Sequence, residues 1–166
     1  LFVIREDLQN RENLTHALSK ASSNPHFIIL DSPTDGQAST CIEGVKSVPS
    51  ETCLTISACD NGMLYDGAKL ERLICDSEID IIVWGVIGYP GAIRSPEMYG
   101  WIDWDKSNGK IHTVSVKEPL KDPRTDPVVV GTFTFKKAAY FTAAAERMKL
   151  RGGQVGGEYY VDTAIN

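Results

Sequence analysis

The chain has few of the residues that mark a metal-binding, redox or membrane protein. Its four cysteines, Cys41, Cys53, Cys59 and Cys75, form no CxxC pair, and only three histidines occur in 166 residues. Zinc sites and thiol redox pairs need clustered ligands, so neither is expected. Free buried thiols in a reducing cytosol fit these cysteines best, which predicts a cytoplasmic protein. The longest apolar runs, such as residues 79–88, are much shorter than a membrane span, so no membrane partner is expected.

An excess of basic residues is also missing. The chain has 17 Lys and Arg against 22 Asp and Glu, a formal net charge of −5. Proteins that bind a nucleic-acid backbone need a basic face that releases counterions, so no nucleic-acid partner is expected. A few local amides and lysines are still enough to hold a small anion. The length fits a single domain over residues 1–166.

Strand-like apolar runs alternate with helical patterns along the chain. Strands are predicted at residues 1–4, 27–30, 53–58, 79–86 and 128–135, and helices at residues 6–19, from Gly36, from a cap at Asp66 and over residues 136–150. The continuous apolar run 27–30 predicts a strand buried on both faces. Asn108-Gly109 between two β-type runs predicts a hairpin. The alternation favours an α/β fold with a mixed, mainly parallel sheet flanked by helices.

Polar clusters follow two of the predicted strands. Thr34, Asp35 and Gly36 come after the strand that ends at Leu30, and Asp60 comes after the strand 53–58. Because ligands of such sheets bind beyond the carboxyl ends of the strands, both clusters should reach the same edge. A glycine lets the backbone approach a base or phosphate, and a carboxylate is the hard oxygen ligand that Mg²⁺ prefers. The pair predicts a nucleotide and magnesium site, although each cluster alone also fits an ordinary turn or cap.

A set of motifs then carries a resemblance to a known family. The motifs are PTDGQAST at 33–40, ISACD at 56–60, MYGW at 98–101, KEP at 117–119, VVVGTF at 128–133 and GEYY at 157–160. In this order and spacing, residues 31–166 resemble the sugar-1-phosphate nucleotidyltransferases, or NDP-sugar pyrophosphorylases. The resemblance implies a Rossmann-like domain of the nucleotide-diphospho-sugar transferase type.

The resemblance also implies a reaction and the residues that carry it. The expected enzyme joins a sugar 1-phosphate, or a similar phosphorylated small molecule, to a nucleoside triphosphate and releases pyrophosphate, for nucleotide-sugar and surface-polysaccharide biosynthesis. The expected cofactor is Mg²⁺. The roles carried over are nucleotide binding for Asp35, Gly36 and Gln37, metal binding and catalysis for Asp60, catalysis and substrate binding for Lys117, and substrate binding for Gly100, Val129 and Glu158.

The chain departs from the family pattern at two places. Where the family usually reads Glu-Lys-Pro, residues 117–119 read Lys-Glu-Pro, so the lysine is displaced by one position and a strand would turn it to the other face. The resemblance places the family's glycine- and arginine-rich phosphate loop before Leu1 and its second metal ligand after Asn166. We therefore expect residues 1–166 to be a single but incomplete domain with little or no turnover by itself.

Two other functions stay open. A non-catalytic nucleotide- or sugar-phosphate-binding module of the same fold would keep the pocket without the chemistry. A glycosyltransferase of related fold would use an Asp-x-Asp metal motif; the only match, Asp103-Trp104-Asp105, lies beside the predicted hairpin and fits a surface coincidence better. The base, the sugar and the oligomeric state are left open, with a homo-oligomer among the alternatives.

Overall fold

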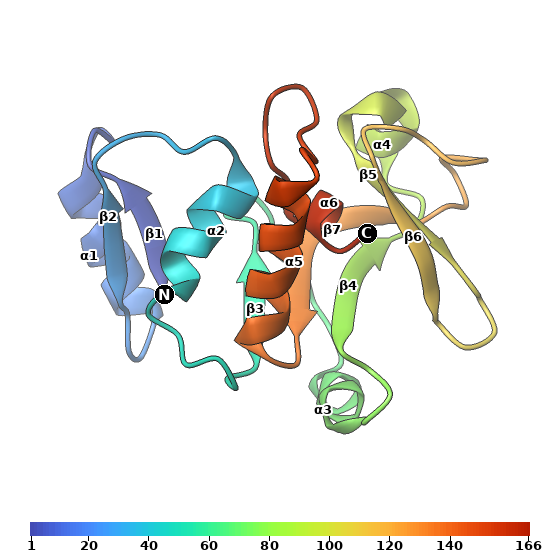
Figure 1. Cartoon of the computed structure of the whole chain (residues 1–166), viewed down its shortest axis with the longest axis horizontal. Helices are drawn as coiled ribbons and strands as arrows, with labels where there is room; N and C mark the ends of the chain where they lie inside the picture. The colour runs from blue at the N-terminus through green and yellow to red at the C-terminus, as the bar shows by residue number, and fades with distance from the viewer.

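The computed structural model describes residues 1–166 and contains two sheets and the helices that cover them (Figure 1). The strands are β1 (Phe2–Arg5), β2 (Phe27–Leu30), β3 (Leu54–Ser57), β4 (Ile81–Val86), β5 (Gly100–Trp104), β6 (Ile111–Val116) and β7 (Val128–Phe135). The helices are α1 (Arg11–Ala21), α2 (Gln37–Val45), α3 (Gly67–Cys75), α4 (Pro90–Arg94), the 3₁₀ turn η1 (Pro96–Met98), α5 (Ala138–Leu150) and α6 (Val161–Ala164). These elements confirm the predicted alternation of strands and helices.

The larger sheet is built from antiparallel pairs, and only β1 and β2 pair in parallel. A mixed α/β fold is thus confirmed, but the prediction of a mainly parallel sheet is wrong. Residues 133–135 of β7 pair with β3 and also with β4, so β7 lies between these two strands. β3 and β4 therefore run in the same direction without being neighbours. The alternation of apolar patterns does not encode which strands become neighbours, and this is why the prediction failed.

A bulge interrupts β7 near its middle. Val83 pairs with Phe133 and Gly85 with Val129, so the chain of β7 is longer than that of β4 across this interval. Gly131 has a φ of +78°, which a glycine adopts without steric cost. At the bulge, one edge of β7 changes partner from β3 to β5. Bulges of this kind re-aim the backbone and are frequent beside functional sites.

The main core lies between β7 and the helices α2, α5 and α6. Phe133 and Phe135 of β7 point into this core, where they join Phe141 and Met148 of α5, all of which are buried. The intervening Thr134 is also buried and accepts a hydrogen bond from Trp84 Nε1 over 3.1 Å on the other face. Burial on both faces therefore fixes β7 at the centre of the molecule.

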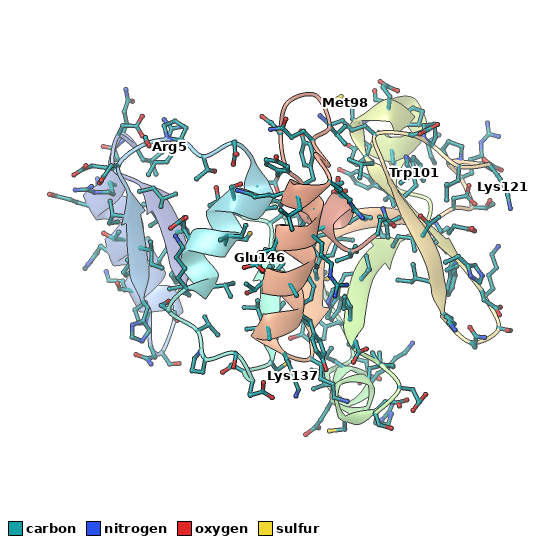
Figure 2. All side chains as sticks on the ribbon, in the orientation of Figure 1. Arg5, Met98, Trp101, Lys121, Lys137 and Glu146 are labelled. Carbon is teal, nitrogen blue, oxygen red and sulfur yellow. The ribbon has the colours of Figure 1, made fainter.

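A second, smaller core supports the β5–β6 hairpin. Trp101, labelled in Figure 2, is completely buried against Ala92 and Val128. Its Nε1 donates a hydrogen bond to the carbonyl oxygen of Pro96 over 2.9 Å, so burial leaves no polar atom of the indole without a partner. The hairpin predicted from Asn108-Gly109 is confirmed, with Gly109 at a φ of +80°.

The first sheet is less buried than its sequence predicts. Ile29 is 39% exposed, so the expectation that residues 27–30 form a strand buried on both faces is wrong. β2 pairs with β1 alone, and an edge strand of a two-stranded sheet has no neighbour to cover its second edge. The small residue Gly44 of α2 lies against this sheet, with Val3 Cγ2 only 3.0 Å from the place a Cβ would occupy.

All four cysteines are free, as predicted, but the expectation that they are buried is wrong for three of them. Cys41 packs against the main core, and burial raises the pKa of its thiol to about 11. Cys53, Cys59 and Cys75 are exposed because they lie at or beyond element ends. None of the helices combines the length and the apolar character needed to cross a bilayer.

Candidate functional site

The turn at Gly36 lies directly against the segment that leads into α6. Tyr159 N donates to Asp35 O over 3.0 Å, and Ala38 N donates to Tyr159 O over 2.9 Å. A Cβ on Gly36 would lie 2.5 Å from Tyr159 N and 2.6 Å from Tyr159 O, and φ at Gly36 is +134°. Only glycine permits this approach of two backbones. Figure 1 shows the red segment after α5 beside the start of α2.

Side chains hold the same turn from both sides. Thr34 Oγ1 donates to the carbonyl of Gly36 over 3.0 Å and lies 2.6 Å from Thr40 Oγ1. Lys149 of α5 places its Nζ 3.7 Å from Asp35 Oδ1 and 5.1 Å from the centre of the Tyr159 ring. This ion pair is exposed and contributes little stability. Asp35 is accessible to solvent, and Gln37, the first residue of α2, is half-buried.

Lys117 reaches the end of the same segment by an unusual backbone conformation. It follows β6 with a φ of +57°, which is uncommon for a residue with a side chain, and its N–H donates to Tyr99 O over 3.0 Å. Its Nζ donates to Tyr160 Oη over 3.0 Å, and that hydroxyl donates to Glu158 Oε2 over 2.6 Å. The bond to Tyr160, followed by the nearby negative charges, raises the pKa of Lys117, so the residue stays cationic.

Gly100, Val129 and Asp162 meet beside Lys117. A Cβ on Gly100 would lie 2.6 Å from Asp162 Oδ2, 3.2 Å from the carbonyl of Ser115 and 3.3 Å from Val129 Cγ2. The half-buried Asp162 accepts a hydrogen bond on Oδ1 from Thr163 N over 3.0 Å. Burial raises the pKa of Asp162 to about 6, because removal of water disfavours the charged carboxylate.

Asp60 lies just beyond β3, which ends at Ser57, and next to the bulge of β7. Its carboxylate is exposed and accepts a bond from Asn61 Nδ2 over 3.3 Å. The same Asn61 amide donates to Val130 O over 2.8 Å, and Ala58 N donates to Gly131 O over 3.0 Å. These bonds attach the residues after β3 to the strand that also carries Val129.

The carboxylate of Asp60 has the chemistry of a single magnesium ligand. No group of three or more His, Cys, Asp or Glu side chains gathers anywhere in the structure, so a site made of protein ligands alone is absent. Mg²⁺ commonly takes one or two carboxylates and completes its shell with phosphate oxygens and water. Asp60 can supply one such carboxylate, which agrees with the sequence-based assignment but does not test it.

Most of the predicted site residues therefore lie along one continuous set of contacts. Gly100, Val129, Lys117 and Glu158 belong to one cluster, which we call the Lys117 pocket and define by these residues together with Tyr160 and Asp162. Asp35 and Gly36 join it through Tyr159. No hydrogen bond or ion pair links Asp60 to the Gly36 turn, so their convergence on one crevice stays a prediction.

Sequence reasoning gave too little weight to two members of this pocket. Asp162 is outside the motifs that carry the resemblance; it lies inside the first turn of α6 and accepts a hydrogen bond only from the next N–H, that of Thr163. Tyr160 was part of the GEYY motif without a role of its own. Their proximity to Lys117 depends on the long-range packing of α6 near β6, which no local pattern in the sequence indicates.

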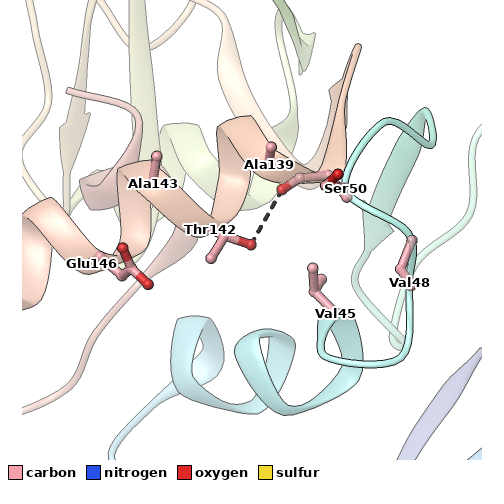
Figure 3. A pocket seen from close by; sticks show the side chains of 8 residues that line it. Val45, Val48, Ser50, Ala139, Thr142, Ala143 and Glu146 are labelled. Carbon is pink, nitrogen blue, oxygen red and sulfur yellow. Dashed lines mark hydrogen bonds between the residues drawn. The ribbon is translucent and has the colours of Figure 1, made fainter.

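A groove elsewhere in the molecule has a different character. It measures about 330 Å³ between the end of α2 and α5 and is lined mainly by apolar side chains, including Val45, Val48 and Ala139 (Figure 3). Glu146 is its charged residue, and the hydroxyl of Thr142 is already bonded to Ala138 O over 3.3 Å. Convergent polar groups, the usual mark of a ligand site, are lacking here.

Comparison with solved structures supports the fold type. The nucleoside-diphosphate-sugar pyrophosphorylase of Vibrio cholerae RC9 is similar with a TM-score of 0.74 at 15% identity, over 99% of this chain and 66% of that one. HddC of Yersinia pseudotuberculosis is similar with a TM-score of 0.61 at 14% identity, over 97% of this chain and 62% of that one. No family model matches the sequence, and no curated protein matches it. The chain therefore shares the fold of these proteins and spans about two thirds of their length.

Proposed function

We propose that this chain is the substrate-binding part of a nucleotidyltransferase that joins a sugar 1-phosphate to a nucleoside triphosphate and releases pyrophosphate. The observation that carries the proposal is the contact between the Gly36 turn and the segment 158–162, which also forms the Lys117 pocket. A nucleotide at the turn and a phosphorylated sugar in the pocket would then be neighbours. The shared fold with a nucleoside-diphosphate-sugar pyrophosphorylase supports the same reading.

The proposed chemistry needs positioning more than a covalent intermediate. An oxygen of the sugar phosphate attacks the α-phosphorus, and the bond from that phosphorus to the oxygen bridging the β-phosphate breaks, which releases pyrophosphate. Lys117 would hold the attacking phosphate by charge, and the Gly36 turn would place the base. Bound Mg²⁺ would neutralise charge on the triphosphate, with Asp60 as its protein ligand. The positive charge of Lys117 suits phosphate binding, and the negative charge of Asp60 suits metal binding.

A binding module without turnover is the second candidate. The donor set is compatible with it, because Asp60 is the single predicted carboxylate for the metal and no group of three or more His, Cys, Asp or Glu side chains gathers in the structure. A binding module would hold triphosphate saturably but release no pyrophosphate. The glycosyltransferase alternative is weaker, since Asp103 pairs with Thr113 in the middle of the β5–β6 hairpin and Asp105 bonds its own turn through Ser107 and Asn108.

Calorimetric titration of the chain with each nucleoside triphosphate and Mg²⁺ tests the proposal. We expect one triphosphate to bind saturably, and Asp60→Asn to weaken that binding about tenfold or more, because a neutral amide is a poorer magnesium ligand. Asp103→Asn is the matched control and should bind as the unaltered chain does. Failure of every triphosphate to bind would overturn the proposal.

Measuring pyrophosphate release with sugar 1-phosphates then separates the two candidates. Release above background by a version extended at both ends, lost in Asp60→Asn, supports the transferase. Saturable triphosphate binding without release, also in a version extended at both ends, supports the binding module. A loss of activity in Asp103→Asn together with sugar transfer from a nucleotide sugar would favour the glycosyltransferase instead.

A further inference from the structure

Asp162 is a half-buried carboxylate with one oxygen that bonds no protein group. Oδ1 accepts from Thr163 N over 3.0 Å, whereas Oδ2 has no hydrogen-bond partner and lies over Gly100, 2.6 Å from where a Cβ would stand. No cation lies within ion-pair distance, because Lys117 is engaged with Tyr160. Oδ2 is therefore the oxygen of this half-buried carboxylate that is open to a hydrogen bond from a ligand.

The surroundings of Oδ2 define what kind of partner fits. Gly100 and Val129 form a floor without side-chain donors, and Lys117 lies near enough to interact with the Asp162 charge. The charged or titratable groups that face this space are Lys117 from the end of β6, and Glu158 and Tyr160 from the segment before α6. A ligand with hydroxyl donors on one side and an anionic group on the other would satisfy Asp162 and Lys117 together.

We propose that Asp162 is a ligand-binding residue whose Oδ2 accepts a hydrogen bond from a hydroxyl of a phosphorylated sugar seated over Gly100. Tyr160 acts as a positioning residue, since its hydroxyl holds the Lys117 ammonium on the side where the phosphate would lie. A side chain at position 100 would displace the Asp162 carboxylate from this position, because its Cβ would lie 2.6 Å from Oδ2. The inference rests on the proposed function and adds a selectivity residue to it.

Binding measurements on sugar 1-phosphates and their monodeoxy analogues test this inference without requiring turnover. Asp162→Asn, which keeps the shape of the side chain, should weaken the best sugar 1-phosphate about tenfold, the size of one hydrogen bond to a charged group. One monodeoxy analogue should bind the unaltered chain about tenfold more weakly yet bind Asp162→Asn no worse than its parent sugar does. Inorganic phosphate, which has no sugar hydroxyl, should bind Asp162→Asn no more weakly than the unaltered chain.

The pH dependence supplies a second readout. Affinity of the unaltered chain for the sugar phosphate should fall as the pH drops below about 6, where Asp162 takes up a proton. Protonation of the ligand phosphate affects Asp162→Asn equally, so the difference between the two profiles isolates this carboxylate. Tyr160→Phe removes the hydrogen bond that holds the Lys117 ammonium, so it should lower the affinity for inorganic phosphate as well as for the sugar phosphate. The difference in affinity between the sugar phosphate and its monodeoxy analogue should stay the same in this variant.

The outcomes separate the two proposals. If sugar phosphates bind and Asp162→Asn has the same affinities, analogue pattern and pH profile as the unaltered chain, the role of Asp162 is overturned and the proposed function stands. If no sugar 1-phosphate binds the unaltered chain, both are overturned. Should Asp162→Asn fail to fold by circular dichroism, Asp162→Ser is measured in its place against the same criteria.

Discussion

Gly36 shows how a single residue type can determine where two distant segments meet. Its positive φ and the 2.5 Å approach to Tyr159 N exclude every side chain, because the colliding atoms belong to the backbone and cannot rotate away. We expect Gly36→Ala to lower the free energy of unfolding by roughly 2 to 4 kcal/mol, from strain and loss of the Tyr159 bonds. Urea unfolding followed by circular dichroism measures it.

Gly62→Ala is the control for this substitution. A Cβ on Gly62 meets nothing within 4 Å and its φ is not positive, so the change should leave stability within about 0.5 kcal/mol. Equal effects at Gly36 and Gly62 would show that the turn is not packed as described.

Asp162 makes a pH-dependent contribution to stability whose sign follows from its pKa. The pKa rises from an ordinary 3.8 to about 6 on folding, so between these values the folded chain binds more protons than the unfolded one. Stability from this group is therefore greatest below about pH 4 and falls as the pH rises towards 6, by about 2 to 3 kcal/mol in total.

Asp162→Asn should remove that dependence. Thermal or urea unfolding between pH 4 and 7 is expected to show a smaller fall in stability with pH for the variant, which becomes the more stable protein near neutral pH. Asp31→Asn, at an exposed carboxylate, serves as the control and should retain the original slope. A variant with the same slope as the unaltered chain would mean that Asp162 is not buried.

At the scale of elements, the short helix α6 (Val161–Ala164) is held against β6 by the side chain of Asn166, which follows it. Asn166 Oδ1 accepts from Val114 N over 2.9 Å and from Thr113 Oγ1 over 3.1 Å, and its amide donates to Val114 O. The side chain thus pairs with the edge of β6 as another strand would. Because Asp162 and Tyr160 belong to this helix or precede it, the bonds of Asn166 also position the Lys117 pocket.

We expect Asn166→Ala to lower the free energy of unfolding by about 1 to 2 kcal/mol, since the hydrogen bonds to Thr113 and Val114 are lost and water can replace them only in part. Denaturant titration measures the change, with Asn24→Ala, at an exposed loop residue, as the control. A difference between the two variants below about 0.5 kcal/mol would contradict the positioning role.

Elements were the best-predicted level of the structure. The bounds of β7 and the Asp66 cap of α3 follow directly from local patterns, and Asp66 indeed accepts from Lys69 N over 3.1 Å. The bulge at Gly131 and the orientation of Lys117 could not be predicted from local sequence patterns, because each depends on contacts between residues distant in the sequence. The lysine displaced by one position was expected to turn away as in a strand, whereas its φ of +57° directs it to Tyr160.

For the whole molecule, the sequence indicated the fold type but not the order of its strands. Motif order places the Gly36 turn, Gly100, Val129 and Glu158 in one family pattern, and the structure brings these residues into continuous contact. Strand order depends on the relative stability of all possible strand pairings, and the sequence of a single segment does not determine it. The insertion of β7 between β3 and β4 is the clearest example.

The central claim is that the Gly36 turn, Asp60 and the Lys117 pocket serve one pair of ligands. The most direct test is an NMR titration of the ¹⁵N-labelled chain, first with a nucleoside triphosphate and Mg²⁺ and then with a sugar 1-phosphate. We predict shifts first at the amides of Gly36 and Asn61, and then at those of Gly100 and Lys117. Shifts confined to the groove between Val45 and Ala139, or the absence of saturable shifts with any triphosphate, would contradict the account.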